Sequence, residues 1–229
     1  MGDDPKFRKV IEAAARLQEI LPDAVLVGGA AAAHHAEHRI SLDDDHVLTD
    51  LRERFDVVLR ALEDTDGWVT ARVRPQVLIL GSLDGVETGI RQLIRRRPLE
   101  TEQVAVGRRR LNVPTIEEIF RIKAWLVLRR NATRDYLDVV ALADRLGARR
   151  SARVVIGIDE FYEDQIGPGG LRVSTQLAKQ LADPVPYDLS QVDLAHYRKL
   201  ASRWRDWSNV VNAARTLAAD VLDLLAEGK

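Results

Sequence analysis

One stretch, from residue 25 to residue 47, constrains the fold of this chain more than any other. It reads VLVGGAAAAHHAEHRISLDDDHV: an apolar run, a Gly-Gly step, a segment of small residues and three consecutive aspartates. The apolar run is typical of a short buried strand, and glycine accepts backbone conformations that other residues avoid. The alanines that follow predict a short helix lying close against a sheet. The stretch therefore predicts a strand, a helix and a second strand in succession.

The aspartates of the second strand indicate a metal site. Side chains alternate between two faces along a strand, so Asp43 and Asp45 are expected on one face and Asp44 on the other. Paired carboxylates suit Mg²⁺, or Mn²⁺ in its place, which binds through one or two carboxylates and the substrate's phosphates. Gly28 and Gly29 are expected to let backbone N–H groups face the same phosphates. Alone, a glycine turn or an aspartate run is more often plain turn geometry or a solvated loop, but the combination is more specific.

Length and composition exclude several classes of protein. The 229 residues fit one large domain or two small ones, and there is no cysteine for a disulfide, a thiolate zinc site or a cysteine nucleophile. No apolar run approaches the roughly 18 residues of a membrane span. The N-terminus lacks the basic and apolar regions of a signal peptide. We therefore expect a cytoplasmic protein with no membrane contact.

The order of the predicted elements defines the fold class. Helices are expected at 5–21, 30–38, 51–62, 115–130, 134–146, 152–162, 171–181 and 204–225, and strands at 24–27, 41–48, 68–73, 77–80, 86–94 and 102–106. A loop is expected at 167–170. This order indicates an α+β protein: an α/β head with a mixed sheet and flanking helices at residues 1–112, then a helical domain at 113–229.

A motif in the first stretch resembles a known family. It consists of Gly28-Gly29 and, about a dozen residues later, Arg39-x-Ser41-x-Asp43-x-Asp45. This spacing resembles the first motif of DNA polymerase β-type nucleotidyltransferases, especially the AbiEii-like group of bacterial toxins and abortive-infection proteins. The resemblance implies that the glycine turn, Arg39 and Ser41 bind the triphosphate of an NTP, and that the two aspartates bind the metal. Ser41 has no local base, so a hydrogen bond to the turn or a phosphate is a better interpretation than a nucleophile.

A second match to the same group lies downstream, in Lys123 and the segment Arg134-Asp135-Tyr136-Leu137-Asp138. Lys123 interrupts an apolar stripe of its predicted helix, so it needs a partner, contacts a phosphate or extends its stem to the surface. Asp135 and Asp138 share a helix face and could orient Lys123, pair with Arg134 or act as a base; an aspartate near a helix start can also simply favour the helix dipole. The resemblance implies that Lys123, Asp135 and Asp138 are catalytic and close the site from the helical side.

The chain departs from the family's pattern at the third metal-binding carboxylate. The candidate strand for this residue carries Gln76, and Asp84 or Glu87 could substitute for it.

Separately, His34 and His38 have a helical i, i+4 spacing that can hold a transition metal. With carboxylates nearby and no cysteine, they are expected to be surface histidines or to support the site without binding metal.

Arginines give the middle of the chain a basic character. They stand at positions 91, 95, 96, 97, 108, 109, 110, 129, 130, 134, 145, 149, 150 and 153. Such a patch attracts a phosphate backbone, although solvated faces paired with glutamates are the alternative. A tRNA or another RNA acceptor is consistent with this pattern.

These features together predict a metal-dependent nucleotidyltransferase that moves a nucleotidyl group from an NTP to an RNA, such as tRNA, or to a protein hydroxyl. The resemblance implies a toxin of a toxin–antitoxin system, with a cognate antitoxin as partner. One alternative is a catalytically degenerate nucleotide- or RNA-binding module that lacks the third carboxylate. Another is an interaction protein that uses its tryptophan-bearing C-terminal helix.

Overall fold

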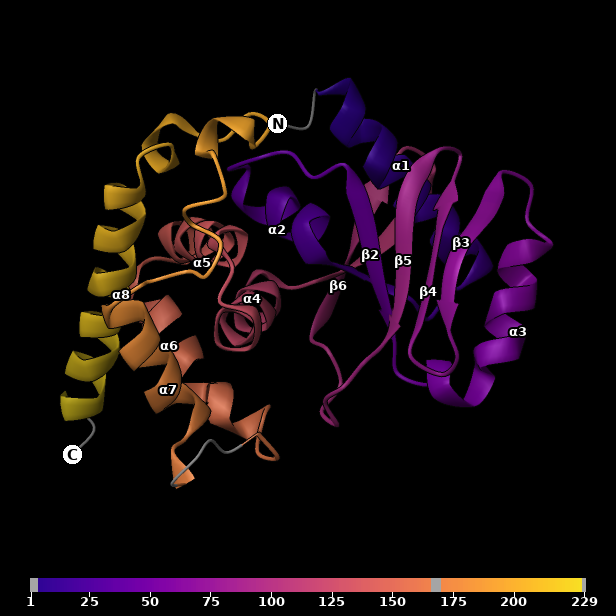
Figure 1. Cartoon of the computed structure of the whole chain (residues 1–229). Helices are drawn as coiled ribbons and strands as arrows, with labels where there is room; N and C mark the ends of the chain where they lie inside the picture. Colours follow the sequence, from indigo (N-terminus) through magenta and orange to yellow (C-terminus); the bar gives the residue numbers. More distant parts are fainter. Residues whose placement is uncertain (1–3, 166–169, 228–229) are drawn as a thin grey trace. The chain divides into compact units, whose positions relative to one another are not determined.

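The computed structural model describes residues 4–165 and 170–227 (Figure 1), so three of the four residues of the expected 167–170 loop lie outside the described residues. The chain divides into two compact units. Unit 1 comprises residues 1–34 and 40–115, and unit 2 comprises residues 35–39 and 116–229. The short segment 35–39 therefore leaves the first unit, joins the second and returns.

Unit 1 is built on a five-stranded mixed sheet. Its elements are α1 (Pro5–Ile20), β1 (Val25–Val27), α2 (Gly28–Ala36), β2 (Asp43–Leu48), α3 (Leu51–Glu63), β3 (Trp68–Arg74), β4 (Leu78–Leu83), β5 (Val86–Gln92), β6 (Thr101–Val106) and β7 (Arg109–Pro114), with the end of α2 reaching into unit 2. The strand order is β1-β2-β5-β4-β3, and β6 and β7 form a separate two-stranded sheet. β2 and β5 run parallel while the other pairs are antiparallel. The mixed sheet with flanking helices confirms the predicted α+β class.

The core of unit 1 lies on one face of this sheet. Leu17 from α1 and Leu51 and Phe55 from α3 pack there with strand residues such as Leu48 and Ile90. The apolar residues of α1 and α3 recur every three or four positions, so the sequence predicts both helices and their buried faces. Since alternate residues of β2 point to this face, the core fixes which aspartates of the strand point the other way.

Two sequence expectations in unit 1 were wrong in detail. The short helix α2 begins at Gly28 itself, without an intervening turn, and it ends at Ala36. Glu37 has a φ of 52°, which ends the helix before His38. Strand β7 was not predicted, because its sequence RRLNVP begins with two basic residues and shows little apolar alternation. Its pairing with β6 supplies the order that local propensity lacks.

Among its described residues, unit 2 contains helices and no strand. Its elements are α4 (Ile116–Arg130), α5 (Thr133–Leu146), α6 (Ala148–Gly157), η1 (Ile158–Glu160), α7 (Val173–Ala182), η3 (Leu194–His196), η4 (Ser202–Trp204) and α8 (Trp207–Glu227). The α4–α5, α6–α8 and α7–α8 pairs make its main helix contacts. Trp204 is buried, and the ring of Trp207 meets Tyr136 edge-on at 5.9 Å between centroids. Both tryptophans therefore take part in the packing of unit 2, with Trp204 buried and Trp207 partly exposed.

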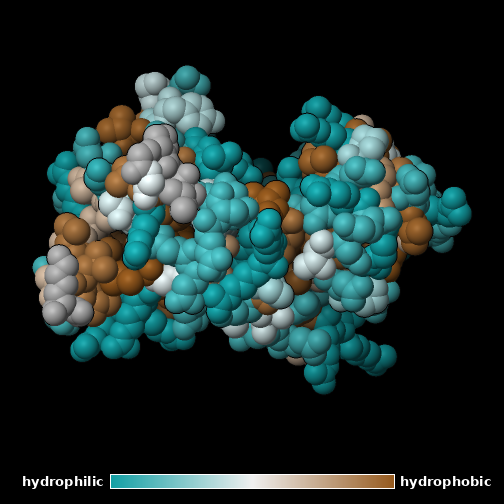
Figure 2. All heavy atoms as spheres, turned by 90° about the horizontal axis from the view of Figure 1, so that it is seen from below, coloured by the Kyte–Doolittle hydropathy of each residue, from teal (hydrophilic) through white to brown (hydrophobic). Residues whose placement is uncertain are grey.

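The surface of the protein is mixed. Figure 2 shows one face, on which hydrophilic residues predominate and hydrophobic residues appear in patches. Among the described residues, no helix is both long enough and apolar enough to cross a membrane.

Candidate functional site

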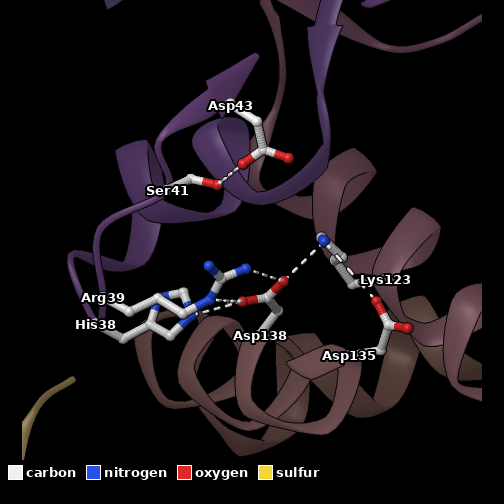
Figure 3. Close-up of polar contacts among 7 residues, drawn as sticks. All are labelled: His38, Arg39, Ser41, Asp43, Lys123, Asp135 and Asp138. Carbon is white, nitrogen blue, oxygen red and sulfur yellow. Dashed lines mark hydrogen bonds and ion pairs between the residues drawn. The ribbon is translucent and has the colours of Figure 1, made fainter. Parts of the chain in front are cut away.

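The strand β2 presents two of its three aspartates away from the core of unit 1. Asp43 is exposed, the side chain of Asp45 is 29% exposed, and Asp44 between them is fully buried. This is the alternation expected of a strand. Ser41 precedes the strand, and its Oγ donates a 2.6 Å hydrogen bond to Oδ1 of Asp43 (Figure 3). Ser41 thus orients the carboxylate of Asp43, a partner other than the turn or phosphate expected from the sequence.

Two glycines make the room that Asp45 occupies. A Cβ atom on Gly28 would lie 3.0 Å from Oδ2 of Asp45, and one on Gly89 would lie 2.6 Å from its Oδ1. Gly28 also has a φ of 71°, a conformation that side chains disfavour. The glycine at the end of β1 therefore permits both the start of α2 and the close approach of the carboxylate. Gly89 was not recognised in the sequence, because only the β2–β5 pairing brings it beside Asp45.

The sheet register distinguishes the three positions considered for a third carboxylate. Glu87 is the β5 residue paired with Asp43, and paired residues share a face, so Glu87 lies on the face of Asp43 and Asp45 and is exposed. Asp84 instead forms an ion pair with Arg16 at the turn after β4. Gln76 is in the turn between β3 and β4, with a φ of 63°, and not on a strand. Glu87 is thus the best-placed candidate, and Gln76 does not occupy the position suggested for it.

The acidic face is not a closed metal site. Within the described part of the chain, no three His, Asp or Glu side chains come close enough together to hold a metal ion. Nε of Arg91, on β5, lies 3.4 Å from Oδ1 of Asp45, and both side chains are partly exposed. The face therefore carries the carboxylates of Asp43 and Asp45, with Glu87 beside them, and the partly exposed guanidinium of Arg91. Carboxylates can bind Mg²⁺ and a guanidinium can bind phosphate oxygens.

The core face of the same strand carries a buried titratable pair. His46 and Asp44 are fully buried, with Nδ1 of His46 3.8 Å from Oδ1 of Asp44. Burial raises the pKa of Asp44 to about 8, and burial lowers the pKa of His46 to about 3. Both groups are therefore uncharged near neutral pH. Asp44 therefore adds no negative charge to the strand near neutral pH.

Four polar side chains converge inside unit 2 on the carboxylate of Asp138 or beside it (Figure 3). Oδ1 of Asp138 accepts from Nε of Arg39 at 2.8 Å and contacts Nε2 of His38 at 2.7 Å, and Oδ2 accepts from Nη2 of Arg39 at 3.0 Å. Nζ of Lys123 lies 2.7 Å from the same Oδ2 and 3.9 Å from Oδ1 of Asp135. All five residues are buried. The network ties the segment 35–39 to α4 and α5.

Lys123 can lie on an apolar stripe of its helix because Asp138 and Asp135 lie beside its ammonium group. Although burial acts to raise it, the charges of Arg39 and Lys123 and the hydrogen bond from His38 hold the pKa of Asp138 well below its usual range. Burial raises the pKa of Asp135 and lowers that of His38. A carboxylate with so low a pKa is a weak base, so the structure favours an orienting role for Asp138.

Other sequence candidates are placed as follows. Arg39, expected at the triphosphate, is engaged in a two-pronged contact with Asp138. His34 and His38 do not share a helix, because α2 ends at Ala36, so their spacing no longer indicates a metal pair. Several of the central arginines are paired with acidic residues, as the alternative interpretation of the basic patch expected: Arg91 with Asp45, Arg109 with Glu19, Arg145 with Glu37 and Arg150 with Glu117.

Comparison with known proteins finds similarity in sequence and in fold. No protein-family model matches the chain. It is 32% identical over 207 residues to the heme uptake protein MmpL11 of Mycobacterium tuberculosis, covering 80% of this chain and 20% of that protein. It is also 32% identical over 130 residues to the mycolic acid-containing lipids exporter MmpL11 of Mycolicibacterium smegmatis, covering 56% of this chain and 13% of that one. The chain thus spans about one fifth or less of the length of these curated relatives.

The structural comparison covers nearly the whole chain. The crystal structure of a presumptive nucleotidyltransferase from H. pylori matches with a TM-score of 0.56 and 14% identity, over 97% of this chain and 96% of the other. An identity this low bears on the fold and not on the chemistry. With its mixed sheet, flanking helices and C-terminal helical unit, the chain has a nucleotidyltransferase-like fold.

Proposed function

We propose that this protein is a metal-dependent nucleotidyltransferase that uses the acidic face of β2 to bind an NTP. The observation that carries the proposal is the joint placement of Gly28, Asp43 and Asp45. The carboxylate of Asp45 lies against Gly28 at the start of α2, where a Cβ atom would crowd it, and Asp43 shares its face. A helix start directly beside paired carboxylates presents backbone N–H groups for phosphates and oxygen ligands for a metal in one place.

The residues present fit a divalent cation. Asp43 and Asp45 would hold Mg²⁺ or Mn²⁺, with Glu87 as the third ligand after a change of rotamer, since the register already places it on that face. When bound, the ion would neutralise charge on the triphosphate during transfer. Gly28 and Gly29 would contribute backbone donors at the start of α2, and Ser41 would keep Asp43 oriented. Arg91 would exchange Asp45 for a phosphate oxygen once the metal is bound.

The finer assignments are part of the same proposal. The arrangement of the first motif supports the AbiEii-like group, and with it a toxin role and a cognate antitoxin. The acceptor is proposed to be an RNA, such as tRNA, or a protein hydroxyl. The catalytic roles of Lys123, Asp135 and Asp138 stay predictions, with Asp138 acting on the position of Lys123 and Arg39. The transport activities named for the curated relatives belong to much longer proteins and enter no part of the proposal.

A second candidate function is a nucleotide-binding module without transfer activity. It is favoured by one observation: within the described residues, no three metal-binding side chains are gathered as the structure stands. If Glu87 does not join Asp43 and Asp45, the face binds one metal ion with the triphosphate and lacks the ligand set for a two-metal clamp. Binding and transfer must therefore be measured separately.

Calorimetric titration with a non-hydrolysable NTP analogue tests the binding step. The wild-type protein should bind the analogue with Mg²⁺ and lose at least about tenfold in affinity in EDTA. Asp43→Asn and Asp45→Asn should each reproduce the EDTA result, while Asp84→Asn should not, because Asp84 pairs with Arg16 away from this face. Binding that is independent of metal and equal in all variants would refute the proposed site.

A further inference from the structure

A pocket in unit 2 is lined by none of the residues assigned to the proposed reaction. It has a volume of about 570 Å³ and is lined by Arg130, Ala132, Arg134, Tyr187, Asp188 and Tyr197. This volume is within the range of small-ligand sites. All six residues belong to unit 2, where the end of α4 turns into α5. From its chemistry, we propose that this pocket is a second nucleotide-binding site, which takes a nucleotide either free or within an RNA strand.

The walls of the pocket are held by hydrogen bonds that do not involve its ligand-binding groups. Oδ1 of Asp188 accepts from the backbone N–H of Thr133 at 2.8 Å and from its hydroxyl at 2.7 Å. The backbone N–H of Tyr187 donates to the carbonyl oxygen of Asn131 at 3.0 Å, and Nδ2 of Asn131 donates to the carbonyl of Val185 at 2.8 Å. The segment 185–188 is therefore fastened to the α4–α5 corner, and a ligand would meet a preformed wall.

The two arginines of the pocket are available to an anion. Arg130 and Arg134 are exposed, and neither forms an ion pair within the part of the chain that the structure describes. Of the lining residues only Asp188 is acidic, and its carboxylate already accepts two hydrogen bonds from Thr133. The lining thus carries one net positive charge. An arginine guanidinium can bind a phosphate through two parallel hydrogen bonds, whereas a lysine ammonium acts only as a point charge. Two arginines at one pocket therefore favour a phosphate-bearing ligand.

The two tyrosines distinguish a nucleotide from a simple anion. Tyr187 is 67% exposed, so the face of its ring is open to a stacking partner. Tyr197 is half-buried, and the guanidinium carbon of Arg39 lies 5.9 Å from the centre of its ring. Rings next to arginines are the combination with which proteins stack a base and hold the neighbouring phosphate. Stacking tolerates any base, so we expect little sequence preference.

The test measures binding of a fluorescent five-nucleotide RNA to the full chain by anisotropy, in EDTA to remove any contribution of a metal. The double variant Arg130→Gln/Arg134→Gln should weaken binding at least about tenfold, because each lost phosphate contact also removes a counterion-release gain. Tyr187→Ala should weaken it about fivefold or more through lost stacking. Arg153→Gln, an exposed arginine of α6 outside the pocket, should change it less than about twofold.

Competition separates the sources of the ligand. AMP should displace the RNA at lower concentration than inorganic phosphate, since the base also binds. Displacement by AMP as efficient as by unlabelled RNA would identify a free nucleotide as sufficient, whereas a clear advantage of the RNA would identify a strand; both support the site. Equal binding by the wild type and the double arginine variant, equal displacement by phosphate and AMP, or no binding at millimolar AMP or RNA would overturn the proposal. Asp43→Asn should leave this binding intact, so failure of the proposed transferase site is a separate result.

Discussion

Replacing Asp138 by asparagine tests the buried network of unit 2 most severely. The substitution keeps the shape of the side chain but removes the negative charge that faces Arg39 and Lys123, both of them buried. Removing one partner of a buried ion pair costs about 3–5 kcal/mol, because the other charges are left without compensation. At about 2–4 °C per kcal/mol for a chain of this size, the melting temperature should fall by roughly 6–20 °C.

Asp144→Asn is the matched control for this change. Asp144 is also on α5 and also pairs with an arginine, Arg203, but both side chains are about half exposed. Exposed pairs contribute about 0–1 kcal/mol, so the control should shift the unfolding free energy by no more than that. Urea unfolding followed by tryptophan fluorescence suits the comparison, because three of the four tryptophans, at positions 125, 204 and 207, belong to unit 2.

The pH dependence of the stability lost in Asp138→Asn provides a further check. The network holds the pKa of Asp138 below its usual range, so its stabilising effect is present above the unfolded pKa of about 3.8 and is lost as the pH falls through the lower folded pKa. Asp138 also raises the pKa of His38, whose unfolded value is 6.5, so the difference in unfolding free energy between wild type and Asp138→Asn should be constant only above that pH, from about pH 7 to pH 8. A deficit below about 1 kcal/mol, equal to that of Asp144→Asn, would contradict the inference that this carboxylate compensates two buried charges.

Three further outcomes follow from the acidic strand. Between pH 3.8 and about 8, Asp44 is protonated in the folded state and ionised in the unfolded state. The free energy of unfolding, measured with urea, should therefore decline by about 2 kcal/mol from pH 6.5 to 8. Asp44→Asn should abolish this decline. Gly89→Ala should displace the carboxylate of Asp45 and weaken Mn²⁺ binding, measured by electron paramagnetic resonance, at least about tenfold, whereas Gly157→Ala, with open space around it, should be neutral. Arg91→Gln should strengthen Mn²⁺ binding by up to about fivefold, since it frees Asp45; weaker binding would contradict a competing role for this arginine.

The sequence predicted well those features that depend on neighbouring residues. The helical stripes, the alternation of the β2 aspartates and the break at Gly28 are all set by periods of two or 3.6 residues or by the backbone freedom of glycine. The mixed α+β class followed from the order of these elements and is confirmed. Strand β7 was not predicted because its sequence begins with two arginines, and its strand conformation is stabilised by pairing with β6.

Features that depend on pairing across the chain could not be predicted. Glu87 was a candidate in the sequence beside Asp84, but only the parallel register of β2 and β5 distinguishes the two. Gly89 acquires its interest from the same register, which no local pattern specifies. Arg39 and Asp138 are 99 residues apart, and nothing in the first motif indicates that this arginine meets a carboxylate of α5. The need of Lys123 for a partner was legible in its apolar surroundings, but the identity of that partner required the fold.

The measurement that tests the central claim most directly is transfer of label from α-³²P-NTPs. The wild-type protein is incubated with each NTP, Mg²⁺ and total RNA or protein, and the acceptors are separated on denaturing gels. We predict label on an acceptor with wild type and with Asp84→Asn, and loss of at least about a hundredfold with Asp43→Asn, Asp45→Asn and Glu87→Gln. Transfer that survives in the Asp43 and Asp45 variants would contradict the account. Metal-dependent binding without any transfer would leave the nucleotide-binding module in its place.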